Sequence, residues 1–79
     1  MGSNTEERQF KIRRNLTDAG CSEALIARFL QLDWQQKRRE QYRLLSRHKA
    51  SLLEQLHHDQ YKIDCLDHMV YAMRQEDQQ

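Results

Sequence analysis

The chain has 79 residues, and its 13 lysines and arginines against 12 aspartates and glutamates leave a formal net charge of +1. A chain this short forms one domain with a small core, so self-association or another stabilising device is expected. The near-neutral charge provides no basic patch for nucleic acid or an anionic membrane, and no apolar run is long enough for a transmembrane helix or signal peptide. We therefore expect a cytoplasmic protein without direct nucleic-acid binding.

The first helix is predicted over residues 4–18. Met1, Gly2 and Ser3 are typical of an expression scar, so the single helical domain is expected to occupy residues 4–79. Asn4 with Glu7 three residues later resembles a capping box, and Gly20 suits the left-handed position after a helix. These signals bound the helix at both ends.

Two further helices follow. Ser22 is a good N-cap for a short helix over residues 23–31. Asp33 followed by Gln36 reads as another capping box, and no glycine or proline occurs after it. The sequence therefore predicts a long third helix over residues 34–75, on the order of 60 Å in length.

The long helix carries a heptad pattern with an apolar stripe. Position a takes Tyr42, Lys49, Leu56, Ile63 and Val70, and position d takes Leu45, Leu52, Asp59, Leu66 and Met73. Only Lys49 and Asp59 are charged, and their charges are opposite. The stripe is longer than the two short helices can cover, which predicts that it packs against a partner.

An antiparallel homodimer satisfies this pattern best. With Leu52 of one chain opposite Leu56 of the other, Lys49 meets Asp59, whereas a parallel pair would bring like charges together in the seam. A shift by one heptad would leave these charges unpaired. The predicted interface comprises Tyr42, Leu45, Lys49, Leu52, Leu56, Asp59, Ile63 and Leu66. The alternative is an intramolecular three-helix bundle in which the same stripe packs on the two short helices.

Two segments carry a resemblance to a known family. They are IRRNLTDAGCSEALIARFL at residues 12–30 and LLSRHKASLLEQLHHDQYKIDCLDHMVYAM at residues 44–73. Together they resemble the C-terminal part of transcription regulators of the MerR (mercury-resistance regulator) family, where two short helices precede a long dimerisation helix. The resemblance implies an antiparallel pairing of the long helices, which the heptad pattern also predicts.

The chain departs from that family at its N-terminus. MerR regulators carry a winged helix-turn-helix of about forty residues before the matching region, and only a handful of residues precede it here. We therefore expect a non-enzymatic dimerisation module that forms homodimers, or heterodimers with a related full-length regulator whose DNA binding it would weaken. An excised fragment of a longer regulator is an alternative that the sequence leaves open.

A stand-alone sensor of small molecules, metals or thiol chemistry is the alternative function. Its candidate ligand cleft comprises Trp34, Tyr61, Met69, Tyr71 and Met73. Cys21 and Cys65 are candidates for a thiol switch. Cys65 and His68 share a helical face but supply only two metal ligands, so no metal or other cofactor is expected. The sequence contains no nucleophile beside a base and no phosphate-binding glycines, so we do not expect an enzyme.

Overall fold

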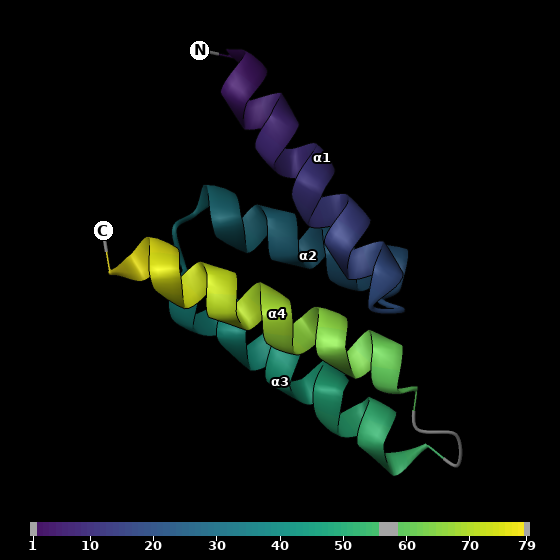
Figure 1. The fold of residues 1–79 in the computed structure, drawn as a ribbon. Helices are drawn as coiled ribbons and strands as arrows, with labels where there is room; N and C mark the ends of the chain where they lie inside the picture. Colours follow the sequence, from purple (N-terminus) through teal and green to yellow (C-terminus); the bar gives the residue numbers. More distant parts are fainter. Residues whose placement is uncertain (1, 56–58, 79) are drawn as a thin grey trace.

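The computed structural model describes residues 2–55 and 59–78. In these residues the chain forms four helices and no strand: α1 (Gly2–Asp18), α2 (Glu23–Trp34), α3 (Arg38–Glu54) and α4 (Gln60–Asp77). Consecutive helices run in opposite directions, and α1 is inclined to the other three in the view of Figure 1. The all-helical class is confirmed, but the described residues hold four helices where the sequence predicts three.

The turn between α1 and α2 follows the sequence signals. Gly20 has φ 76°, the left-handed conformation that glycine adopts without strain. Ser22 caps α2 by accepting a hydrogen bond from the backbone N–H of Leu25 at 3.2 Å. The start of α1 differs from the prediction, because Asn4 lies inside the helix and not at its N-cap.

The third helix begins later than predicted. α2 continues through Asp33 to Trp34, and Gln36 then takes a positive φ of 60°, so the Asp33 capping box does not form. α3 starts at Arg38 after an N-cap residue, Lys37, that makes no side-chain capping bond. The Asp33 carboxylate is bound instead by Arg8 of α1, and this tertiary ion pair replaces the local role that the sequence suggests.

The prediction of one long helix over residues 34–75 is wrong, because α3 ends at Glu54. Gln55 is extended, with φ −73° and ψ 151°, and Asp59 is also extended as the N-cap of α4. The Asp59 carboxylate accepts a hydrogen bond from the backbone N–H of Lys62 at 3.3 Å. A side chain assigned to the seam of a continuous helix therefore starts a new one, and α4 folds back along α3.

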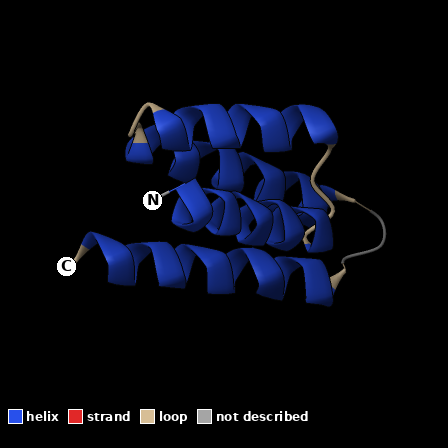
Figure 2. Cartoon of the chain, turned by 90° about the horizontal axis from the view of Figure 1, so that it is seen from above, coloured by secondary structure: helices blue, strands red, loops and turns tan. Residues whose placement is uncertain are grey.

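The four helices enclose one core. Each helix contacts two others, in the cyclic order α1, α2, α3, α4 and back to α1. Figure 2, seen from above, shows the helices running alongside one another. The buried cluster contains Ile12, Leu16, Ala19, Ile26, Phe29, Leu45, Leu52, Ile63, Leu66, Met69 and Met73. The core thus draws on the apolar positions of every helix.

The apolar stripe is buried within the chain itself. Leu45 and Leu52 on α3, and Ile63 and Leu66 on α4, are at most 5% exposed. The antiparallel packing is shifted by about one heptad from the register predicted for the dimer, because Lys49 binds Asp67 at 2.7 Å, eight residues after Asp59. Lys49 can reach the helix edge along its flexible stem, so the shifted register leaves it paired.

The α1–α2 turn rests on the other two helices. His48 of α3 lies with its Nε2 2.8 Å from the Ala19 carbonyl oxygen, where a ring N–H donates to the end of α1. A Cβ at Gly20 would lie 2.9 Å from the Lys62 Cδ of α4. The turn is therefore constrained by its backbone conformation and by a close side-chain neighbour.

Substitution Gly20→Ala is expected to destabilise the fold by about 1 kcal/mol or more, because alanine is strained at this φ. Urea unfolding followed by circular dichroism measures the change. In a Lys62→Ala background the steric part of the penalty should vanish while the backbone part remains. A Gly20→Ala variant as stable as the parent in both backgrounds would contradict this account of the turn.

Candidate functional site

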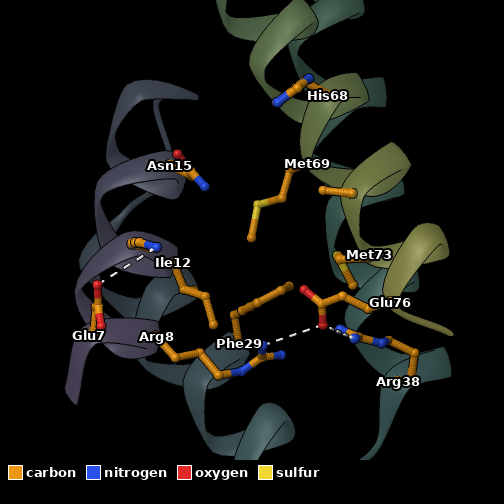
Figure 3. A pocket seen from close by; sticks show the side chains of 12 residues that line it. Glu7, Arg8, Ile12, Asn15, Phe29, Arg38, His68, Met69, Met73 and Glu76 are labelled. Atoms are coloured by element: carbon orange, nitrogen blue, oxygen red, sulfur yellow. Dashed lines mark hydrogen bonds and ion pairs between the residues drawn. The ribbon is translucent and has the colours of Figure 1, made fainter. Parts of the chain in front are cut away.

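Side chains from all four helices meet in a charged cluster at one end of the bundle. Arg8 of α1 and Arg38 of α3 both donate to the same carboxylate oxygen of Glu76 on α4, at 3.3 and 3.0 Å. We call this arrangement the arginine clamp. Figure 3 shows Glu76 lying between the two arginines. The clamp therefore links three helices through one carboxylate.

Each arginine of the clamp is also held by a second carboxylate. Arg8 donates through Nε and Nη2 to the two carboxylate oxygens of Asp33, both at 3.0 Å. Arg38 donates through Nε to Asp77 at 2.9 Å. A planar guanidinium matches a carboxylate with two parallel hydrogen bonds, as Arg8 does with Asp33, and Arg38 is oriented by its separate bonds to Asp77 and Gln41.

A buried glutamine connects the clamp to the core. Gln41 is 1% exposed, and its amide nitrogen donates to the Phe29 carbonyl at 3.3 Å and to Asp33 at 3.2 Å. Its amide oxygen accepts from Arg38 at 3.2 Å. Among the described residues, no buried side-chain nitrogen or oxygen lacks a partner. The polar cluster is thus satisfied, as a buried network must be to avoid a desolvation penalty.

The cluster changes the ionisation of its members. The hydrogen bonds from Arg8 lower the pKa of the Asp33 carboxyl, and the same contact raises the pKa of Arg8. The Tyr42 hydroxyl donates to Asp77 and lowers the pKa of that carboxyl, with Arg38 acting in the same direction. The carboxylates of Asp33 and Asp77 therefore remain charged to lower pH than free side chains.

A groove with an apolar floor lies beside the clamp, between α1 and α4. Its volume is about 520 Å³, and its apolar lining comes from Ile12, Phe29, Met69, Ala72 and Met73. The polar lining consists of Glu7, Arg8, Lys11, Asn15, Arg38, His68 and Glu76. In Figure 3 the side chains of Ile12, Phe29 and Met69 point into the space between the helices, and the clamp closes one end.

The predicted ligand cleft is divided by the structure. Met69 and Met73 line the groove, although both are mostly buried. Trp34 lies at the end of α2 and is 80% exposed, whereas Tyr61 and Tyr71 are 64% and 62% exposed on α4. The three aromatic side chains do not line the groove with the methionines.

The predicted interface residues serve other roles within the chain. Leu45, Leu52, Ile63 and Leu66 are in the core, and Tyr42 is half-buried with the Arg74 guanidinium 5.8 Å from its ring centre. Lys49 pairs with Asp67, and Asp59 caps α4. Leu56 lies outside the described residues. The homodimer that these residues were expected to form stays a prediction.

The two cysteines are separate, half-buried free thiols. Burial raises the pKa of the Cys21 thiol to about 11, so little of the nucleophilic thiolate is present at neutral pH. Interaction with the Cys65 side chain raises the pKa of the Tyr61 phenol. In residues 2–55 and 59–78, no three His, Cys, Asp or Glu side chains are placed to hold a metal ion.

Sequence reasoning missed the arginine clamp. Arg8 and Glu76 are 68 positions apart, so no local spacing relates them. One available signal was the placement of Glu76 and Asp77 in the last turn of α4, because carboxylates are unfavourable at the negative end of a helix dipole. Acidic residues in that place indicate that cations from elsewhere compensate them.

Comparison of the chain with models of protein families, with curated proteins and with solved structures gives no match. None of the helices in the described part of the chain has the length and apolar character to cross a membrane. The contacts of this chain alone are therefore the basis for assigning its function.

The charged cluster predicts acid sensitivity. Because the pKa of Asp33 is lower in the folded chain than in the unfolded chain, its stabilising contribution is present above about pH 4 and is lost as the pH falls toward the folded value. Substitution Asp33→Asn should lower the melting temperature at neutral pH and flatten its decline below pH 4, measured by circular dichroism. The control Asp64→Asn removes an exposed carboxylate outside the cluster and should keep the parental decline. An unchanged decline in Asp33→Asn would contradict the assignment.

Proposed function

We propose that this chain is a non-enzymatic helical interaction module whose copies pair by exchanging α4. The single observation that carries the proposal is the antiparallel hairpin of α3 and α4, which buries within one chain the stripe that the sequence assigns to a dimer. In the exchanged dimer, α4 of each copy would occupy the same place on the other copy. Exchange of an identical element is a low-cost route to a dimer because it reuses existing contacts.

The contacts available for exchange are specific. Arg38 binds Glu76 and Asp77, and Lys49 binds Asp67, so three ion pairs link α3 to α4 across the hairpin. The core positions Leu45, Leu52, Ile63 and Leu66 accompany them. Two chains running antiparallel in this register would make each of these contacts twice. The proposed dimer therefore has a defined register. This register is shifted by about one heptad from the register that pairs Lys49 with Asp59.

The chemistry of the connection supports the proposal. Residues 55–59, QLHHD, contain neither glycine nor proline, so this segment has no residue that forbids a helix joining α3 to α4. The N-cap bond of Asp59 favours the monomer, in which α3 and α4 are separate helices. Propagation of the helix through this segment would favour the exchanged dimer, in which α3 and α4 form one continuous helix. The proposed pairing with a related full-length regulator would use the same exchange of α4.

A proline at the first position of α4 tests the exchange. Gln60 follows an N-cap residue with φ −88° and ψ 97°, and proline is favourable at this first helical position. In a helix running continuously through residue 60, proline costs about 3 kcal/mol or more. Substitution Gln60→Pro should therefore keep the monomer and raise the dimer dissociation constant more than about a hundredfold, measured by sedimentation over a concentration series.

Two variants serve as its controls. Gln60→Ala removes the same side chain without a proline and should dimerise as the parent does. Asp59→Leu removes the cap and places an apolar residue at a heptad d position, so it should strengthen dimerisation. Parent and Asp59→Leu chains that both remain monomeric throughout the series would overturn the proposal. Equal dimerisation of Gln60→Pro and Gln60→Ala would exclude a dimer built on a continuous helix.

A mixing experiment tests whether the ion pairs form between chains. Lys49→Glu alone and Asp67→Lys alone each place like charges at the Lys49–Asp67 contact, whereas a mixture of the two variants restores opposite charges across an exchanged dimer. Because exposed pairs are worth about 0.2–1 kcal/mol, the ratio of heterodimer to either homodimer should be roughly twofold or more above its statistical value. Native mass spectrometry measures the shares. A purely statistical mixture would contradict the proposed register.

A further inference from the structure

The geometry points to a carboxylate ligand site formed by the arginine clamp and the apolar groove. We propose that the groove binds a small amphipathic molecule with an apolar body and one carboxylate, and that the carboxylate displaces Glu76 from between Arg8 and Arg38. This inference goes beyond the proposed dimerisation, although both proposals involve the contacts of Arg38 with Glu76 and Asp77. The exchange of α4 would rebuild the same groove from two chains, so ligand binding does not depend on the outcome of the dimerisation tests.

The clamp already holds a carboxylate. Arg8 and Arg38 converge on one oxygen of Glu76, at 3.3 and 3.0 Å. Asp33 and Asp77 bind the same arginines through other nitrogens, so both cations would keep their orientation after Glu76 leaves. Preorganised donors lower the cost of binding an anion, because no side chain has to be ordered at that moment. Because the clamp binds the carboxylate of Glu76, we infer that its ligand also carries a carboxylate.

Glu76 is suited to be displaced. Its side chain is 48% exposed and lies in the last turn of α4, one residue before the helix ends at Asp77. A carboxylate there is opposed by the helix dipole, and exposed ion pairs contribute little to stability. A ligand carboxylate that enters from the groove would meet the same two arginines.

The remainder of the groove suits an apolar body. Ile12, Phe29, Met69 and Met73 line its interior, and its volume of about 520 Å³ falls in the range of small-molecule sites. Methionine side chains adapt their shape to irregular ligands. Lys11 and His68 also line the groove, and their side chains are exposed to solvent. The apolar lining and the clamp at one end together select a molecule with a carboxylate at one end.

Octanoate is the probe that tests this site, with acetate and octanol as partial ligands that carry only the carboxylate or only the chain. Isothermal titration below the micelle concentration should show octanoate binding at least tenfold more tightly than either. Arg38→Gln should weaken octanoate binding about tenfold or more, since the loss of one charge-assisted hydrogen bond is sufficient for a change of that size. Glu76→Gln should strengthen it severalfold by removing the competing charge.

Two further variants keep the test decisive if Arg38→Gln does not fold. Ala72 is an exposed groove residue on α4, and Ala72→Phe should fill the groove and abolish binding while circular dichroism stays helical. Arg13→Gln removes an exposed cation that pairs with Glu23 outside the groove and should leave binding unchanged. Equal affinity for octanoate and octanol, weaker binding by Glu76→Gln, or full binding by folded Ala72→Phe would each overturn the proposal.

Discussion

The return of α4 along α3 is the contact on which the rest of the fold depends. It covers the apolar stripe of both helices and places the C-terminal turn of α4 beside the N-terminal turn of α3, where Arg38 meets Glu76 and Asp77. α1 and α2 then close the remaining sides, because α1 contacts α4 and α2 contacts α3. Without this hairpin, Leu45 and Leu66 would be exposed and the arginine clamp would lose its central carboxylate. The core and the candidate site are therefore consequences of one chain reversal.

Local signals are sufficient for some boundaries and insufficient for others. Ser22 and Gly20 have the predicted roles because a cap and a left-handed turn depend on few neighbouring residues. Asp33 has an equally good capping pattern, yet a bidentate ion pair with Arg8 competes for its carboxylate. For Asp59 the opposite holds: its place in the apolar stripe predicts an ion pair across a dimer interface, but in the structure it is the N-cap of α4. A heptad pattern identifies which residues become buried and leaves open whether the covering helix belongs to the same chain.

The candidate site is less accessible to sequence reasoning than the core. Met69 and Met73 are predictable as cleft residues because methionines on an apolar face have a limited set of roles. Composition groups Trp34, Tyr61 and Tyr71 with them, but these three side chains are exposed at separate positions on α2 and α4. Arg8, Arg38 and Gln41 come together only when the four helices pack, so their positions in the chain carry no joint signal. Polar networks that span several helices are a property of tertiary structure and not of periodicity.

The same helix serves both proposals, and this has a physical consequence. α4 supplies Met69, Met73 and Glu76 to the groove, while α1 and α3 supply Arg8 and Arg38. In the closed chain these groups belong to one molecule, whereas in an exchanged dimer the arginines of one copy would face the glutamate of the other. A carboxylate that replaces Glu76 removes one link between α4 and the rest of the bundle, but its apolar body packs against Met69 and Met73. Because the exchanged dimer would rebuild the same groove and the same Glu76 ion pairs, a ligand would have equal affinity for the closed chain and the dimer and would leave the equilibrium between them unchanged.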